Sequence, residues 1–194
     1  AVRAFYGRER EIGLLSDLLT SEVKRMVVIN GIPGIGKTTL LAKFAQNVRE
    51  STNVFWYKVH EWANLKALLR PLAEFLSQMG RRNLEWYLNQ TEAPLVGEAT
   101  HILETDLKDV SVLLIFDDVH KAEPSVLEFL GALLAIMEGM EHVRAVCTAR
   151  ELPTFYSRSI VFRGTVEELN LEGLDRDSSV QMMRSRGLSS ADVE

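Results

Sequence analysis

The chain has 194 residues, 46% of them hydrophobic and 25% charged, and its formal net charge at pH 7 is -5. This length and composition are typical of a soluble globular protein that buries a core of its own. The negative charge argues against a dedicated nucleic-acid-binding domain, although a local basic patch stays compatible with it. The single cysteine, Cys147, excludes an internal disulfide and is expected to be a small buried hydrophobic residue.

Neither a membrane span nor a targeting segment is evident in the sequence. No run reaches the roughly 18 apolar residues that a membrane-spanning helix needs. The N-terminal residues lack the pattern of a signal peptide. We therefore expect a cytoplasmic protein with no membrane among its partners.

Helical and extended hydrophobic patterns alternate along the chain. Apolar residues three and four apart predict amphipathic helices, and short continuous apolar runs predict buried strands. Pro71 inside the third predicted helix predicts a kink there or a division into two helices. In chain order, the predicted elements are a helix over 12–19, a strand over 25–30, a helix over 40–48, a strand over 54–59, helices over 65–79 and 95–107, a strand over 110–116, a helix over 126–140, strands over 142–149 and 159–164, and a helix that follows Asp175 and stops at Gly187.

This alternation of strands and helices predicts an α/β fold with a mainly parallel sheet that helices cover on both faces. The continuous apolar runs of three strands favour the same architecture over a sheet with one solvated face. No Pro/Gly-rich linker divides the chain. Its character changes near Leu171, where the predicted strands stop and a polar helical tail begins.

The segment GIPGIGKT, at 31–38, fits the phosphate-loop pattern G-x-x-x-x-G-K-[ST] and lies between a predicted strand and a predicted helix. Glycines let backbone amides face an anion, and the helix N-terminus adds partial positive charge. A plain glycine turn before a solvated lysine is the alternative, whereas the dinucleotide pattern G-x-G-x-x-G does not fit. The residues of this segment that we expect to bind nucleotide are Gly31, Pro33, Gly34, Ile35, Gly36, Lys37, Thr38 and Thr39.

Three side chains of the segment have specific expected roles. Lys37 is expected to reach the β- and γ-phosphates of the nucleotide. Thr38 is expected to offer its hydroxyl to Mg²⁺, which prefers octahedral oxygen coordination. Thr39 is expected to contact the α-phosphate.

The other half of such a site is an acid that follows a neighbouring strand. The segment LLIFDDVH, at 113–120, supplies Asp117, expected to hold Mg²⁺ through water, and Asp118, placed where a general base could orient the attacking water. A strand-end turn or a helix cap is the alternative interpretation of these two carboxylates. Asp118 is also shorter than the Glu at many related sites, which leaves its action as a base open.

The predicted strand over 54–59 lies between the loop strand and the acid strand in the sequence. This arrangement favours the class of P-loop protein in which the strand after the acid inserts between the other two, in the order 5-1-4-3-2. The inserted strand would then be 142–149, and Arg150 would follow it at the carboxyl edge, where ligands bind. Its planar guanidinium could bind the γ-phosphate. An exposed loop arginine is the alternative.

Five segments in this order, FYGREREIGLL, GIPGIGKTT, LLIFDDVH, CTAR and LNLEGL, resemble the STAND branch of the AAA+-related P-loop ATPases. The likeness covers nearly the whole chain and is strongest to archaeal-type ATPases. NB-ARC domains and origin-recognition ATPases are more distantly similar. The resemblance implies a three-layer P-loop NTPase domain over 1–170, followed over 171–194 by the truncated beginning of a helical lid.

The resemblance also implies the bound ligands and the binding site of the base. ATP or ADP with Mg²⁺ would be the ligand, and Phe5, Tyr6 and Arg8 would lie around the adenine and ribose. A polar lead-in to the first helix is the alternative interpretation of these residues. Leu174, at the junction to the lid, would line the base side of the pocket.

We therefore expect an ATP-binding, slowly hydrolysing nucleotide switch in which Lys37, Asp117, Asp118 and Arg150 carry the chemistry. One alternative is a switch that binds nucleotide without turnover, which the short Asp118 and the missing lid favour. Another is a DNA-acting AAA+ module of the initiator or loader type, against which the acidic composition weighs. Self-association, or a partner protein that binds through absent C-terminal domains, is left open.

Other conspicuous residues have plainer expected roles. Trp56, Trp62 and Trp86 are expected to pack in the core or between helices rather than to stack on bases. His120 is expected to be a loop residue, with a phosphate ligand as the alternative.

Overall fold

A computed structural model describes residues 7–174 and residue 180. Several sequence predictions lie outside these residues: the positions of Phe5 and Tyr6, the helix after Asp175 with its end at Gly187, and most of the lid segment 171–194. In the part of the chain that is described, no helix is both long and apolar enough to cross a membrane.

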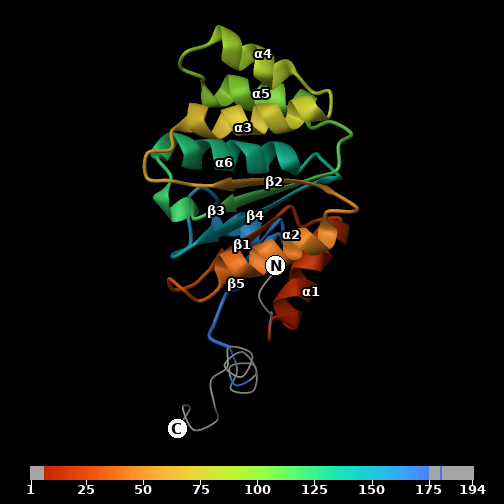
Figure 1. The fold of residues 1–194 in the computed structure, drawn as a ribbon, viewed down its shortest axis with the longest axis vertical. Coiled ribbons are helices and arrows are strands. Elements are labelled where there is room, and N and C mark those ends of the chain that lie inside the picture. Colours follow the sequence, from red (N-terminus) through yellow and green to blue (C-terminus); the bar gives the residue numbers. More distant parts are fainter. Residues whose placement is uncertain (1–6, 175–179, 181–194) are drawn as a thin grey trace.

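A five-stranded sheet forms the centre of the molecule, with helical layers on both sides (Figure 1). Every pair of neighbouring strands in it is parallel, in the order β2-β3-β4-β1-β5. This is the predicted order 5-1-4-3-2 seen from the other edge, so the predicted fold class is confirmed. The strands are β1 (Met26–Asn30), β2 (Asn53–Lys58), β3 (Val112–Asp117), β4 (Val143–Ala149) and β5 (Val166–Asn170).

Helices α1 and α2 cover one face of the sheet, and α3 and α6 cover the other, with α4 and α5 stacked further out (Figure 1). Each face needs apolar side chains because helices exclude water from both. The helical elements are α1 (Glu9–Thr20), α2 (Lys37–Val48), α3 (Leu65–Gln78), α4 (Asn83–Gln90), α5 (Val96–Asp106), the 3-10 turn η1 (Val119–Lys121), α6 (Pro124–Met137) and α7 (Arg158–Phe162).

Successive residues of the central strands enter the two cores alternately. In β3, Leu114 and Phe116 pack into the core under α3 and α6, while Leu113 and Ile115 pack into the core under α1 and α2. All six residues of this strand are buried. This two-sided burial is the reason why the strand is a continuous apolar run in the sequence.

The fifth strand was placed wrongly by the sequence pattern. Residues 159–162 of the predicted strand 159–164 lie in helix α7, and the edge strand is β5, over Val166–Asn170. Among the described residues, β5 lies at the edge of the sheet beside β1. Its polar side chains remain near the surface, where Glu167 pairs with Lys24 and Glu168 with Arg158. An edge strand of this kind lacks the apolar run by which buried strands are found.

Two further differences concern the helices. Helix α3 continues through Pro71 as one element rather than two, with Leu68, Leu69 and Leu72 buried around the proline. Helix α4 was not predicted. Two of the three tryptophans are also more exposed than expected, since Trp62 is 77% and Trp86 68% exposed.

Two buried arginines attach helices α1 and α6 to the sheet. Arg144 donates to the carbonyls of Leu18 (2.9 Å) and Ser21 (2.6 Å) at the end of α1, and Arg25 donates to the carbonyl of Met137 (3.0 Å) at the end of α6. Cations at helix C-termini are favourable because they complement the partial negative charge there. Burial, assisted by the charge of Arg25, lowers the pKa of Arg144. The contact fixes the position of α1, which begins at the functional site.

Candidate functional site

The loop between β1 and α2 has the glycines that its conformation requires. Gly34 and Gly36 have φ angles of 81° and 102°, in the region that side chains disfavour. Gly31 is needed for a different reason: a Cβ there would lie 2.8 Å from the carbonyl oxygen of Leu171. Leu171 in turn donates its N–H to the carbonyl of Asn30 at 2.7 Å. The loop therefore packs directly against the segment that follows β5.

The side chain of Lys37 bends back over this loop. Its Nζ donates to the carbonyl oxygens of Gly31 (2.6 Å) and Ile32 (3.1 Å), and the residue is 7% exposed. Burial is the main cause that lowers the pKa of Lys37, and the charge of Asp118 opposes it. The ammonium group is held at the first residues of the loop, so an anion bound by the loop amides would lie close to it.

Thr38 and Asp117, the two residues that the sequence analysis assigns to Mg²⁺, are in direct contact. The Thr38 hydroxyl lies 3.1 and 3.0 Å from the two carboxylate oxygens of Asp117, which is fully buried at the end of β3. A hydroxyl and a carboxylate are the hard oxygen ligands that Mg²⁺ prefers, so these residues fit the ion. In residues 7–174 and 180, no three His, Cys, Asp or Glu side chains group together to bind a metal. Mg²⁺ here would also need oxygens of the nucleotide.

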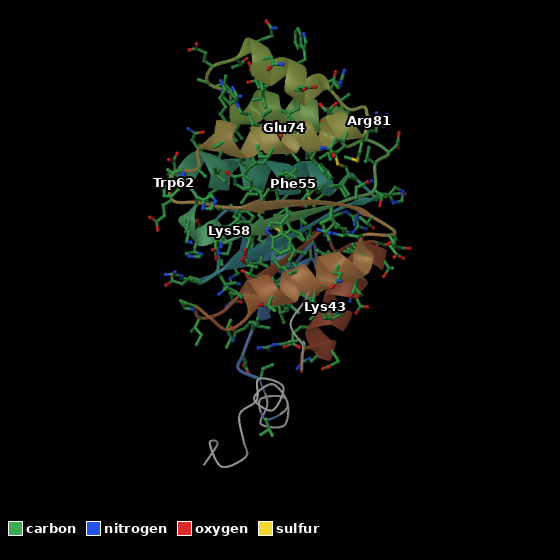
Figure 2. All side chains as sticks on the ribbon, viewed as in Figure 1. Lys43, Phe55, Lys58, Trp62, Glu74 and Arg81 are labelled. Atoms are coloured by element: carbon green, nitrogen blue, oxygen red, sulfur yellow. The ribbon has the colours of Figure 1, made fainter. Side chains whose placement is uncertain are left out.

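Asp118 follows in a left-handed conformation, with φ 66° and ψ 40°. Its carboxylate forms an ion pair with Lys121 at 3.2 Å, and the Nζ of Lys58 lies 4.0 Å away. Lys58 ends β2 directly beside Asp117 in the sheet register, and Figure 2 shows it on the left of the view, on the same side as Trp62. Both lysines approach the same oxygen of this carboxylate, Oδ2.

His120 and Arg150 lie at the same edge of the sheet. Both ring nitrogens of His120 are buried without a hydrogen-bond partner among the described residues. Burial is the main cause that lowers the pKa of His120, and the charge of Asp118 opposes it. Arg150, exposed directly after β4, is close enough that its charge lowers the pKa of both Lys37 and His120. This is the edge at which the sequence analysis expects Arg150.

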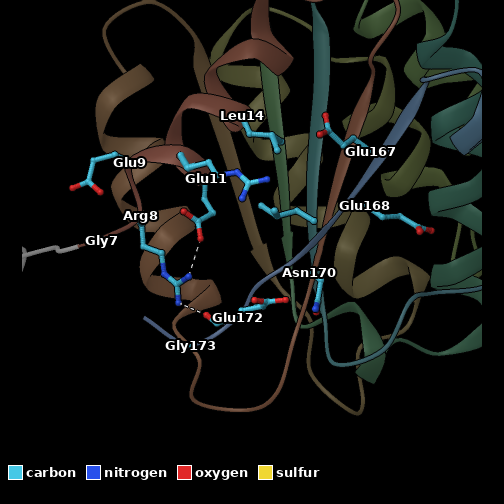
Figure 3. A pocket seen from close by; sticks show the side chains of 12 residues that line it. Gly7, Arg8, Glu9, Glu11, Leu14, Glu167, Glu168, Asn170, Glu172 and Gly173 are labelled. Atoms are coloured by element: carbon cyan, nitrogen blue, oxygen red, sulfur yellow. Dashed lines mark hydrogen bonds and ion pairs between the residues drawn. The ribbon is translucent and has the colours of Figure 1, made fainter. Parts of the chain in front are cut away.

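Arg8 connects three parts of the chain beside the phosphate loop. It is 6% exposed and donates to the Glu11 carboxylate (2.8 Å) and to the carbonyls of Glu172 (2.6 Å) and Ile35 (3.4 Å). Figure 3 shows the first two of these contacts at the wall of a cleft. The guanidinium is thus already bound by protein acceptors. A nucleotide base beside Arg8 would therefore contact the aliphatic part of its side chain or share one of these hydrogen bonds.

The cleft, of about 610 Å³, lies between the start of α1 and β5 (Figure 3). Acidic side chains face it from both sides, Glu9 and Glu11 from α1 and Glu167 from β5. Gly173, one residue before Leu174, also lines the cleft. The lining residues are Gly7, Arg8, Glu9, Arg10, Glu11, Leu14, Glu167, Glu168, Leu169, Asn170, Glu172 and Gly173.

Sequence reasoning missed two side chains that contact the acids. Thr148 donates to Asp117 at 2.6 Å, and Lys121 pairs with Asp118 at 3.2 Å. A single hydroxyl in the apolar run VRAVCTA was the available signal for Thr148. For Lys121, the available signal was its position three residues after Asp118, a spacing at which the two side chains can form an ion pair.

A glycine loop between a strand and a helix, with a buried acid on the next-but-one strand, defines a P-loop nucleotide-binding domain. Residues 4–146 match the AAA ATPase domain family, so the chain belongs to that family. Nucleotide binding is a property of this family.

Two solved structures share the fold. Cdc6p from Pyrobaculum aerophilum has a TM-score of 0.66 and is 16% identical, covering 93% of this chain and 49% of that one. The Orc1 protein of Aeropyrum pernix, solved in complex with DNA, has a TM-score of 0.67 and is 16% identical, covering 95% of this chain and 50% of that one. The chain therefore spans about half of either protein, and at this identity the likeness concerns the fold.

A relative in sequence is an uncharacterized WD repeat-containing protein of Nostoc sp. strain PCC 7120. It is 24% identical over 212 residues, which cover 100% of this chain and 16% of that protein.

Proposed function

We propose that the chain is a STAND-type nucleotide switch that binds ATP and hydrolyses it slowly. The observation that carries this proposal is the contact of Thr38 with Asp117 beside a glycine loop to which the Lys37 ammonium group is hydrogen-bonded. It combines groups for phosphate and for Mg²⁺ in one place. The domain would comprise 1–170, and 171–194 would begin the lid.

In this proposal the loop amides and Lys37 bind the phosphates, and Thr39 adds a contact to the α-phosphate. Thr38 and Asp117 would hold Mg²⁺, which when bound supplies positive charge to the phosphate oxygens. Arg150 would contact the γ-phosphate from the end of β4. The protein supplies position and charge, which account for most of the acceleration of phosphoryl transfer.

Hydrolysis would proceed by attack of a water oxygen on the γ-phosphorus. The bond from that phosphorus to the β–γ bridging oxygen breaks, and ADP leaves with the bond electrons. Asp118 orients the water and takes its proton. We expect the reaction to be slow because the Asp118 carboxylate is short and is paired with Lys121.

The nucleotide base would bind beside the first helix, where Arg8 lines the cleft next to the phosphate loop. Phe5 and Tyr6 would complete this binding site. Arg8 also contacts Glu172, and Gly31 packs against Leu171, so the start of the proposed lid touches both the base side and the phosphate side. Through these contacts, a conformational change on loss of the γ-phosphate would be transmitted to further domains or to a partner protein.

A specific observation favours a second candidate, a switch that binds nucleotide without turnover. Lys121 forms an ion pair with one oxygen, Oδ2, of the proposed base Asp118 at 3.2 Å. The DNA-acting alternative has less support, since the net charge is -5 and acidic side chains line the cleft.

Thermal unfolding with Mg-ATP, with Mg-GTP and without nucleotide tests the proposal. At 100 times the dissociation constant, ligand binding stabilises the folded state by about 2.7 kcal/mol, which raises the melting temperature of a domain this size by roughly 5–10 °C. The variant K37A should lose this shift but keep its own cooperative transition. No shift with either nucleotide would refute the proposal, and a larger shift with GTP would refute the adenine assignment.

A further inference from the structure

The last residue of β5, Asn170, lines the cleft between α1 and β5 with its side chain (Figure 3). Its Oδ1 accepts a hydrogen bond from Nδ2 of Asn30 at 3.2 Å. An asparagine amide has two acceptor lone pairs and two N–H donors. In the part of the chain that the structure describes, the contact with Asn30 is the one hydrogen bond of the Asn170 side chain. Asn170 therefore retains both N–H donors and one lone pair for a ligand in the cleft.

Both walls of this cleft adjoin the phosphate loop. Strands β1 and β5 are parallel, and their register sets Asn30 beside Asn170 at the carboxyl edge of the sheet, where ligands bind in open parallel sheets. Asn30 directly precedes Gly31, the first residue of the loop. On the other wall, Arg8 reaches the carbonyl of Ile35 in the loop at 3.4 Å. A nucleotide whose phosphates occupy the loop would thus have its base within reach of the cleft, whose volume of about 610 Å³ is in the range of small-molecule sites.

The other polar side chains of the cleft are charged and offer one kind of hydrogen-bonding group each. Three of the carboxylates are already in ion pairs, those of Glu11, Glu167 and Glu168. An ionised carboxylate only accepts hydrogen bonds, and a guanidinium only donates them. Among the lining residues that the structure describes, Asn170 has the one side chain that both donates and accepts.

Adenine presents a donor and an acceptor side by side, at N6 and N7, and an asparagine amide pairs with both. Guanine presents two acceptors, O6 and N7, on the same edge. An amide whose oxygen faces N6 of adenine would face O6 of guanine with no proton between the two oxygens. To offer an N–H to O6, the amide of Asn170 would have to turn, and this would break its hydrogen bond with Asn30.

We propose that the Asn170 side chain selects adenine over guanine at the base-binding end of the site. Its Nδ2 donates to N7 of the base, and the second lone pair of Oδ1 accepts from N6–H. This inference rests on the proposed function, because it concerns the base of the nucleotide that the phosphate loop binds.

The test compares the dissociation constants of Mg-ATP and Mg-GTP, measured by titration calorimetry, in the wild type and in two variants. N170D keeps an acceptor for Asn30 and nearly the same shape but has no N–H donor, and N170A removes the amide. The added charge of aspartate repels the phosphates of both nucleotides alike, so the ratio of the two constants reports on the base. The matched control is N53D, because Asn53 is exposed at the start of the opposite edge strand, β2, where it donates to the carbonyl of Ser111 at 3.1 Å.

A bidentate pair with a base discriminates against the wrong base by about 5- to 150-fold. We expect the wild type to bind ATP at least about tenfold more tightly than GTP, and each Asn170 variant to lose at least about fivefold of this ratio. N53D should keep the ratio of the wild type. A further nucleotide, 7-deaza-ATP, has a C–H group in place of N7: the wild type should bind it about threefold or more weaker than ATP, and N170A should bind both alike.

The outcomes separate this inference from the proposed function. If the wild type binds neither ATP nor GTP, the proposed function fails and this inference fails with it. If the wild type binds ATP but does not distinguish it from GTP or from 7-deaza-ATP, the inference alone is overturned. The same holds if N170D and N170A keep the ratio of the wild type, whereas a lower ratio in both, with N53D unchanged, supports it. If one of the two variants does not fold, the other decides.

Discussion

The guanidinium of Arg8 donates to the backbone carbonyl of Glu172 at 2.6 Å, across 164 positions of the chain. It also reaches the carbonyl of Ile35 in the phosphate loop at 3.4 Å. One buried cation therefore joins the start of the first helix, the phosphate loop and the beginning of the segment after β5. These are the parts that a nucleotide switch must couple.

Replacement of Arg8 should loosen this connection. Hydrogen bonds that involve a charged group contribute roughly 1.5–3 kcal/mol each, so we expect R8Q to lower the free energy of unfolding by about 1–3 kcal/mol in urea. E11Q is the matched control, because it removes the ion pair with Arg8 but leaves the two carbonyl contacts. An equal loss in R8Q and E11Q would contradict a role for the carbonyl contacts.

The proposed metal site predicts how nucleotide binding depends on Mg²⁺. In the wild type, addition of EDTA should remove most of the ATP-induced rise in melting temperature. In D117N this rise should already be small and should no longer respond to EDTA, because a neutral amide is a poor ligand for a hard cation. D106N controls for loss of a buried carboxylate elsewhere, since Asp106 is fully buried and accepts from Leu84 N–H at 2.9 Å. A full EDTA response in D117N would remove Asp117 from the metal site.

The ion pair between Lys121 and Asp118 predicts a variant with faster hydrolysis. In K121Q the Asp118 carboxylate loses its nearer ion pair, and we expect single-turnover phosphate release to rise by about threefold or more. D118N should reduce the rate to background, and the double variant should behave like D118N. K58Q, which removes the more distant lysine, is the control. A slower K121Q would show instead that Lys121 assists the reaction.

The buried position of His120 leads us to expect that the stability of the protein depends on pH. Burial lowers the pKa of His120 from its ordinary value of 6.5, so on acidification the unfolded chain takes up a proton before the folded protein does. The folded state therefore loses free energy of unfolding as the pH falls below about 6.5, down to the lowered pKa. Urea unfolding at several pH values between 7.5 and 5 should show this decline in the wild type and a shallower decline in H120Q.

The control for this measurement is H101Q, which removes a histidine whose side chain is 84% exposed. Equal pH dependence in the wild type and in H120Q would contradict the effect of burial on His120.

Much of the fold and the centre of the site could be predicted because they rest on local patterns. Strand β3 is buried on both faces, so the five residues before Asp117 had to be apolar. The loop needs positive φ angles at Gly34 and Gly36, and only glycine adopts these without strain. Such requirements act on consecutive residues, and the sequence by itself therefore determined the phosphate loop and the acid strand.

Other features were decided only by the tertiary structure. Strand β5 lies at an edge, where Glu168 pairs with Arg158, so its side chains have no periodic apolar pattern to reveal it. The hydroxyl of Thr148 reaches Asp117, 31 positions earlier, only because β4 lies beside β3 in this register. A polar residue in an apolar run carries no information about the strand it will face. Contacts of this kind follow from the packing of distant segments, which no local requirement specifies.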